Sequence, residues 1–388
     1  MLYEPTRFDA LIDEPWVSAH VEDAIAAIVA DADAAFDPAA LWPAHEWDAQ
    51  AKPLPLSGLY LGAAGMVWAL DALRERGHPD SSHDLAAVVA RAVELERATP
   101  DFAADEHYRP GALMSGETGA LLVAFRLTSD PAFADDLHAL VRGNVDNPTD
   151  DISWGAPGTL LAALAMGERT GEHRWEVAAR ESAAALRERR GPDGLWRQDD
   201  DYRGLSTLHG VAGNTLALLR FEPDGAVASE SADVLSRHAF REDGLANWPG
   251  SPRPQLRRPR DGRICLQWCT GGPGVIGGAW EYLDDDLLLA GAELIWRAGA
   301  HQDEKGHGLC HGTSGNGFAL LKAFARTGDE RWLERARGFA VHALAQAERI
   351  AAANGRRRYS LFNGDAGTAL FAAACLDADP RFPIVDVI

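Results

Sequence analysis

The segment Gly308-Leu-Cys-His-Gly-Thr-Ser-Gly-Asn-Gly-Phe-Ala-Leu-Leu321 joins a GxxG element, Gly312 to Gly315, to a mostly apolar run. A stretch that is apolar on every side is typical of a fully buried helix, and the glycines mark its start. The same element followed by an apolar stretch occurs seven times, at 62–65, 116–119, 155–158, 210–213, 271–274, 312–315 and 364–367. This repeat, rather than the length of 388 residues, decides the fold class.

The spacing of the copies indicates two helices per repeat. Successive first glycines are 39 to 61 residues apart, which leaves room for two helices and two loops. Two repeats also share the pattern Thr-Gly-acidic-x-Arg-Trp, at 170–175 and 327–332. There the glycine ends one helix, and the acidic residue opens a second helix whose charged and apolar residues alternate at helical spacing. Each repeat is therefore expected to be a helical hairpin.

Stacked hairpins form either an open solenoid or a closed ring, and periodicity alone does not distinguish them. Small glycines at every inner-helix start favour close approach around a tight ring. We therefore predict an all-α protein, a closed α/α toroid of seven helical hairpins with inner and outer seven-helix layers and GxxG at each inner-helix start. Residues 1–388 are expected to form one domain, with residues 1–50 as an N-terminal outer helix or cap.

Composition narrows the class of protein. The chain is 46% hydrophobic and 24% charged, which is typical of a globular protein and excludes a disordered one. Its net charge of −21 opposes binding to nucleic acid or anionic lipid, so neither is an expected partner. No secretory signal and no apolar run of about 18 to 20 residues is evident, and we therefore expect a cytoplasmic protein with no membrane association.

Reactive side chains recur at fixed positions before the glycines. Cys269 and Cys310 lie two residues before the first glycine of their repeats, His209 and His311 lie one before, and Asp151 lies four before. These residues belong to repeats three to six, and consecutive repeats are neighbours in a ring. We therefore expect the five side chains to line one arc at one end of the central cavity.

Two thiolates and an imidazole, from Cys269, Cys310 and His311, are a soft ligand set suited to Zn²⁺, with a fourth position open. Alternatively, the cysteines are small buried hydrophobic residues and His311 starts a helix. Cys265 could add a fourth ligand and close the site, whereas Cys375 belongs to an apolar run and is expected in the core.

His209 and Asp151 each have two interpretations. His209 could be a hydrogen-bonded structural histidine or a group that transfers protons. Asp151 could cap a helix or orient His209 as its carboxylate partner.

Three motifs resemble the signatures of lanthionine synthetase C-like proteins: His209-Gly-Val-Ala-Gly-Asn214, Trp268-Cys-Thr-Gly-Gly-Pro-Gly274 and Cys310-His-Gly-Thr-Ser-Gly-Asn316. The resemblance covers all seven repeats, from about residue 55 to 375. It implies a seven-plus-seven helix toroid with one catalytic zinc held by Cys269, Cys310 and His311. It also implies that His209 is the acid/base group and that Asp151 is its companion.

The family joins a cysteine thiol to dehydroalanine or dehydrobutyrine and so makes a thioether. The resemblance thus implies a stand-alone enzyme that adds glutathione or a peptide cysteine to a dehydrated peptide or protein. A cyclase that closes (methyl)lanthionine rings within a precursor peptide is one alternative. A non-catalytic scaffold that binds zinc, thiols or a kinase is another. Thr270 stands where the family often has an aromatic residue or histidine, and Cys265 stands where an arginine is expected, which Arg263 could replace.

Basic residues recur six to eight positions before the first glycine in five repeats: Arg109, Arg203, Arg263, Lys305 and Arg358. They could be ordinary solvated loop charges. If they lie at the rim of the ring, they make the entrance to the cavity positive and concentrate an anionic substrate there, such as the carboxylates of glutathione or a phosphorylated Ser/Thr peptide. We therefore predict that they bind substrate.

Overall fold

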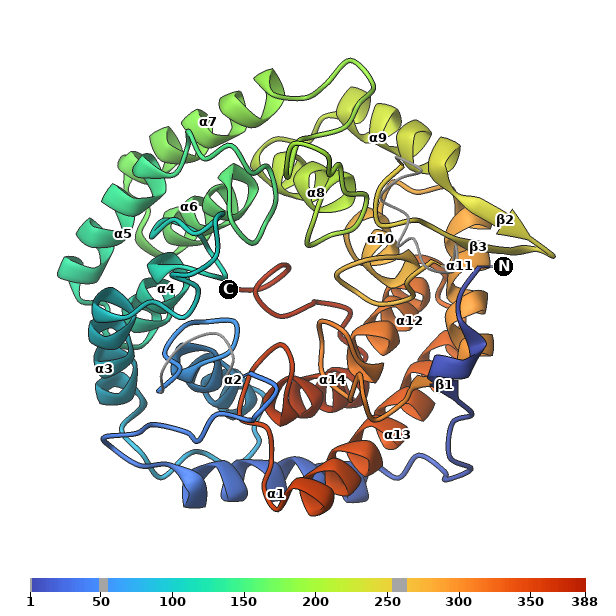
Figure 1. Ribbon diagram of the computed structural model, residues 1–388, viewed down its shortest axis with the longest axis horizontal. Coiled ribbons are helices and arrows are strands. Elements are labelled where there is room, and N and C mark those ends of the chain that lie inside the picture. Colours follow the sequence, from blue (N-terminus) through green and yellow to red (C-terminus); the bar gives the residue numbers. More distant parts are fainter. Residues whose placement is uncertain (1, 49–54, 253–263) are drawn as a thin grey trace.

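The GxxG elements start seven α-helices that surround the centre of the molecule (Figure 1). The computed structural model describes residues 2–48, 55–252 and 264–388. Within these ranges the inner helices are α2 (Ala63–Glu75), α4 (Glu117–Thr128), α6 (Ala156–Thr170), α8 (Val211–Phe221), α10 (Gly272–Ala279), α12 (Thr313–Thr327) and α14 (Asp365–Asp377). The first glycine of each GxxG is the residue that precedes its helix.

An outer layer of helices alternates with the inner ones along the chain (Figure 1). In the described ranges it consists of α1 (Ser18–Ala35), α3 (Leu85–Ala98), α5 (Pro131–Gly143), α7 (His173–Glu188), α9 (Gly225–His238), α11 (Asp285–Ala298) and α13 (Glu330–Asn354). The segment 1–50 contributes α1, which packs against α14. No helix in these parts of the chain combines the length and hydrophobicity needed to cross a bilayer. The prediction of an α/α toroid is confirmed.

Contacts between the two ends of the repeat series close the ring. The last inner helix, α14, packs against the first, α2. Backbone hydrogen bonds also join residues that stand two positions before the first glycine in neighbouring repeats: Met114 N to Ser153 O (3.2 Å), Cys269 N to Cys310 O (3.2 Å), Cys310 N to Phe362 O (2.8 Å) and Phe362 N to Tyr60 O (3.5 Å). The last of these links the seventh repeat to the first, so the solenoid alternative does not apply.

Close backbone approach explains the GxxG element. A Cβ on the second glycine of any copy would lie 1.8 to 2.4 Å from the carbonyl oxygen six residues earlier. No side chain fits there, so the first turn of each inner helix requires glycine at this position. Gly210 and Gly271 also have positive φ angles, 137° and 119°, which other residues rarely adopt. These two glycines follow His209 and Thr270, so at these two turns the first glycine is required as well.

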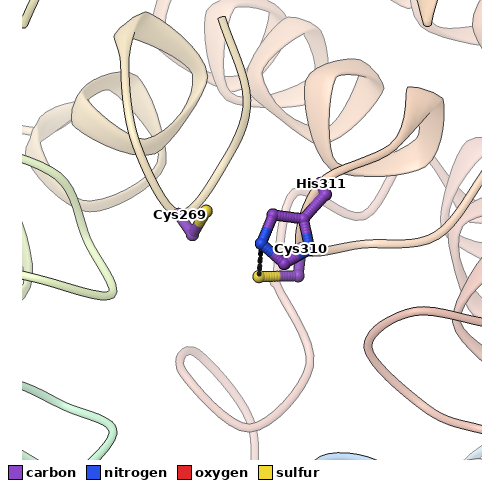
Figure 2. Close-up of side chains that lie close together, drawn as sticks. All are labelled: Cys269, Cys310 and His311. Atoms are coloured by element: carbon purple, nitrogen blue, oxygen red, sulfur yellow. Dashed lines mark hydrogen bonds between the residues drawn. The ribbon is translucent and has the colours of Figure 1, made fainter. Parts of the chain in front are cut away.

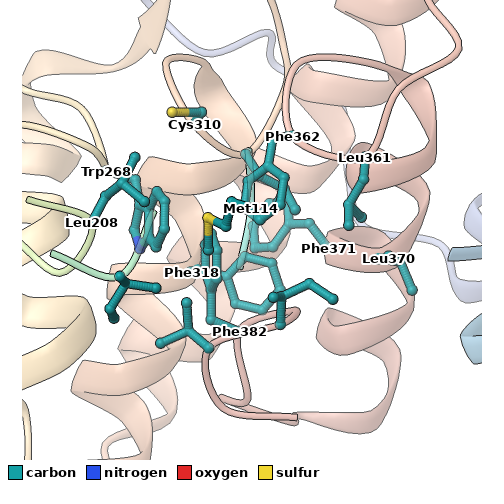
Figure 3. Packing of buried hydrophobic residues seen from close by; sticks show 14 of the residues in the cluster. Met114, Leu208, Trp268, Cys310, Phe318, Leu361, Phe362, Leu370, Phe371 and Phe382 are labelled. Carbon is teal, nitrogen blue, oxygen red and sulfur yellow. The ribbon is translucent and has the colours of Figure 1, made fainter. Parts of the chain in front are cut away.

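The chain after α14 turns back into the centre of the ring, where the C-terminus lies (Figure 1). The ring of Phe382 stacks on Trp268, with centroids 4.3 Å apart, and meets Phe318 edge-on at 5.0 Å (Figure 3). Asp386 accepts hydrogen bonds from Lys322 (2.6 Å) and Arg220 (2.5 Å). The C-terminal segment therefore fills the centre of the ring and packs against Trp268, the residue that precedes Cys269.

Short antiparallel strand pairs complete the described structure. β1 (Phe8–Asp9) pairs with β4 (Ala300–His301), which ties the N-terminal segment to the sixth repeat. β2 (Phe240–Glu242) pairs with β3 (Leu245–Asn247) in the connection that leads towards the fifth GxxG.

Candidate functional site

Cys269, Cys310 and His311 come together in the structure as the sequence predicts (Figure 2). Their two sulfurs and one imidazole nitrogen all lie within 4.8 Å of one another, and Cys310 Sγ is 3.7 Å from His311 Nε2. Ligand atoms around a tetrahedral zinc, with Zn–S of about 2.3 Å, are roughly 3.5–3.8 Å apart. Cys269 precedes α10, whereas Cys310 and His311 precede α12. The donor set and its spacing fit zinc.

Neighbouring side chains orient these ligands. His311 Nδ1 lies 3.3 Å from Asn363 Oδ1 and, when protonated, donates a hydrogen bond to it, which leaves Nε2 as the unprotonated ligand nitrogen. Gln267 Nε2 donates a hydrogen bond to Cys269 Sγ (3.0 Å). The sequence analysis missed both residues, although Asn363 stands one position before its glycine, as His311 does.

The two buried thiols shift each other's pKa in opposite directions. A hydrogen bond from Cys310, together with the nearby His311, lowers the pKa of Cys269 well below its usual value. Burial and the neighbouring Cys269 raise the pKa of Cys310, and the charge of Lys305 partly opposes this. Both cysteines are almost fully buried, and a metal cation bound between them would favour their thiolate forms.

His209 and Asp151 also come together. His209 Nδ1 lies 2.7 Å from Asp151 Oδ2, and the carboxylate is 1% exposed. The other oxygen of Asp151 accepts a hydrogen bond from Trp154 N (2.8 Å). Asp151 therefore has both roles considered for it: it orients His209, and it closes a turn of its own backbone. Burial by itself lowers the pKa of His209, but the hydrogen bond and charge of Asp151 outweigh burial and raise it. Asp151 thus holds His209 through Nδ1 and favours the charged form of its imidazole.

The hydroxyl of Ser206 connects the segment that carries His209 to the segment that carries Cys269. Ser206 Oγ donates to the carbonyl oxygen of Cys269 (2.6 Å) and accepts from His209 N (3.4 Å). Ser206 thereby fixes the position of His209 relative to Cys269.

Both groups open into one cavity of about 370 Å³. The residue immediately before the first glycine lines it in four consecutive repeats: Trp154, His209, Thr270 and His311. Asp151, Cys269, Gln267, Tyr202 and His107 line it as well. Cys265 also faces the cavity but is not one of the three clustered ligands, and Cys375 is buried in α14. The ligand set therefore has three members and an open side towards the cavity.

The basic residues predicted to bind substrate differ in their exposure and in the groups that they contact. Arg203 is half-buried, and its guanidinium donates to the carbonyl oxygens of Tyr202 (2.8 Å) and Asp199 (2.5 Å), two residues that line the cavity. Lys305 is half-buried and acts on the pKa of Cys310. Arg109 is exposed and donates to backbone carbonyls of its own loop.

Arg358, the fourth of these residues that the structure describes, is paired with an acidic side chain. Arg358 is 8% exposed and forms a bidentate ion pair with Asp48, with Nε 2.6 Å from Oδ2, and its guanidinium lies 5.4 Å from the Trp47 ring. Its charge is neutralised by Asp48. Arg263 lies outside the described residues.

Comparison with known proteins agrees with this architecture. The family model described as "Lanthionine synthetase C-like protein" matches residues 57–387. "Glutathione S-transferase LANCL1" of Danio rerio is 35% identical over 203 residues, 50% of this chain and 47% of that protein. "LanC-like protein GCL1" of Arabidopsis thaliana is 27% identical over 199 residues, 47% of this chain and 43% of that protein. The matches therefore span about half the length of these curated relatives.

A solved structure titled "Nisin cyclase" aligns with 92% of this chain and 94% of its own, with a TM-score of 0.60 and 15% sequence identity. At this identity the likeness concerns the fold.

Proposed function

Since the chain belongs to the lanthionine synthetase C-like family, we propose that it is an enzyme that adds a thiol to dehydroalanine or dehydrobutyrine. The observation that carries the proposal is the single cavity that joins the Cys269–Cys310–His311 cluster to the His209–Asp151 pair. Thiol addition to an alkene needs a way to form a thiolate and a donor that returns a proton to carbon. The cavity offers a ligand set for the first need and, for the second, a histidine whose charged form is favoured by Asp151.

Cys269, Cys310 and His311 would hold one zinc ion, which, when bound, supplies the Lewis acidity that lowers the pKa of a substrate thiol. The thiolate sulfur bonds to the β-carbon while the π electrons of the alkene move towards the α-carbon and the adjoining carbonyl oxygen. His209 Nε2 then gives its proton to the α-carbon, and the proton lost by the thiol restores the imidazolium. Asp151 favours the charged form of His209 and, through its hydrogen bond to Nδ1, holds the imidazole with Nε2 directed to the substrate.

Glutathione is the thiol that we propose. The relative named "Glutathione S-transferase LANCL1" is 35% identical over 203 residues of this chain, and that name points to glutathione. The substrates are then glutathione and a dehydrated residue of a peptide or protein. We propose a cytoplasmic location, because metal-binding thiolates and a free thiol substrate persist where cysteines stay reduced, and all four cysteines of this chain are free.

A reaction with two peptides tests the proposal. The zinc-loaded full chain should add one glutathione to a dehydroalanine peptide that lacks cysteine, faster than the uncatalysed reaction, and mass spectrometry would detect the adduct. The second peptide contains dehydroalanine and cysteine; loss of its free thiol without glutathione would indicate a ring-closing cyclase instead. No acceleration with either peptide would contradict an enzyme and favour a zinc- or thiol-binding scaffold.

We further propose that Lys305 and Arg203 attract the carboxylates of glutathione. Replacing either residue with alanine should raise KM for glutathione about 3- to 10-fold, because a lost charge contact of this kind is worth roughly 1 kcal/mol. KM for an uncharged thiol such as 2-mercaptoethanol should not change, because that thiol has no carboxylate for these residues to attract. Arg91→Ala, an exposed arginine on α3, is the matched control. Equal losses with the charged and the uncharged thiol would contradict the assignment.

A further inference from the structure

Tyr202 lines the cavity from the loop between α7 and α8, and no repeat position marks it in the sequence. Its main chain is fixed: Tyr202 O accepts hydrogen bonds from Gln198 N (3.2 Å) and from the Arg203 guanidinium (2.8 Å). Gln198 Nε2 in turn donates to the carbonyl oxygen of Asp150 (2.6 Å), directly before Asp151. The loop is thus attached to the same segment that orients His209.

The phenol ring of Tyr202 stands beside the proton donor and the metal cluster. Its centroid is 6.5 Å from that of His209, with the ring planes at 76°. Its hydroxyl makes a side-chain hydrogen bond with Thr270, the residue after Cys269. A Cβ on Gly250 would lie 3.7 Å from this hydroxyl, so the backbone of Gly250 passes close to it. The hydroxyl is therefore held at the cavity wall next to Thr270, on a ring that faces His209.

The surroundings of Tyr202 keep its hydroxyl protonated. Burial raises its pKa above the usual value, and the negative charges of Cys269 and Asp151 raise it further. A protonated phenol is a neutral hydrogen-bond donor, whereas the carboxylates of Asp151 and Asp199 in the same cavity only accept. Tyr202 can therefore donate to an oxygen that becomes negative.

We propose that Tyr202 is a further catalytic residue, whose hydroxyl donates a hydrogen bond to the carbonyl oxygen of the dehydrated residue as the thiol adds. This inference rests on the proposed thiol addition. When sulfur bonds to the β-carbon, the π pair places negative charge on this oxygen until His209 delivers a proton to the α-carbon. Tyr202 keeps its own proton throughout and stabilises the transient charge. Removing one such donor typically lowers kcat about 10²–10³-fold.

Tyr202→Phe, which deletes only the hydroxyl, is the test. We expect kcat for glutathione addition to fall about 100-fold, with KM for glutathione and zinc content within twofold of the wild type. The control is Tyr282→Phe, a half-buried tyrosine between α10 and α11 that does not line the cavity. It should keep the wild-type kcat. If the wild type turns over and Tyr202→Phe does so equally fast, the Tyr202 proposal fails while the proposed function stands.

Binding of unreactive peptides decides the same point without turnover. One peptide carries an anionic phosphinate in place of the carbonyl group of the dehydrated residue, and its partner carries a neutral amide. Tyr202→Phe should bind the phosphinate peptide about 100-fold more weakly and the amide peptide within twofold of the wild type, by isothermal titration calorimetry. A variant that loses both peptides equally, or a wild type that binds neither, would overturn the proposal.

Discussion

Cys310→Ala should reduce the zinc content from about one ion per chain to a small fraction and lower thioether formation at least about 100-fold. Loss of a neighbour that merely orients a ligand costs 10 to 100-fold in metal affinity or activity, and loss of a buried thiolate ligand removes more. The toroid should remain folded, because its core is spread over seven repeats and does not depend on the metal as a small zinc finger does. Elemental analysis, circular dichroism and the glutathione assay measure the three effects.

Cys375→Ala is the matched control for this variant. Cys375 is as buried as Cys310, but it lies within α14 and away from the cluster. Both changes remove a buried sulfur and should lower the free energy of unfolding by a similar amount, about 1–3 kcal/mol. Only Cys310→Ala should lose zinc. Full zinc retention in Cys310→Ala would mean that the ligands are wrongly assigned.

His209→Asn should retain zinc yet lower kcat about 10²–10⁴-fold, because donation of a proton to the α-carbon is separable from activation of the thiol. The variant His138→Asn, a half-buried histidine on α5, should keep the wild-type rate. Zinc content and single-turnover rates would be measured for both. A wild-type rate in His209→Asn would identify another group as the donor.

The pH dependence of the rate provides a second test of His209. Asp151 raises the pKa of His209, and the reaction needs the charged imidazolium. The rate should therefore fall as the pH rises through this raised pKa. In Asp151→Asn the charge that raises the pKa is gone, so the fall should occur at lower pH, with a smaller loss at low pH than His209→Asn causes. An unchanged pH profile would separate Asp151 from the titration of His209.

The sequence determined the fold class and the central site, because both depend on local geometry. The second glycine of each GxxG is required wherever the chain passes within van der Waals distance of a carbonyl six residues earlier, and this requirement repeats with the fold. Residues at equal positions before equivalent turns then occupy equivalent places around the ring. This is why Cys269 and Cys310 meet, and why His209 and His311 line one cavity.

Only the tertiary structure decided the contacts that depend on loop paths and on ring closure. Tyr202 reaches the cavity on a loop whose course is fixed by hydrogen bonds to the preceding repeat, and no periodic signal encodes such a course. Arg358 matches the spacing of the other basic residues, yet its charge is neutralised by Asp48, 310 residues earlier in the chain. The periodicity of a sequence specifies the local structure of each repeat. The partner that a side chain finds in a distant part of the chain depends on which segments the closed ring brings together.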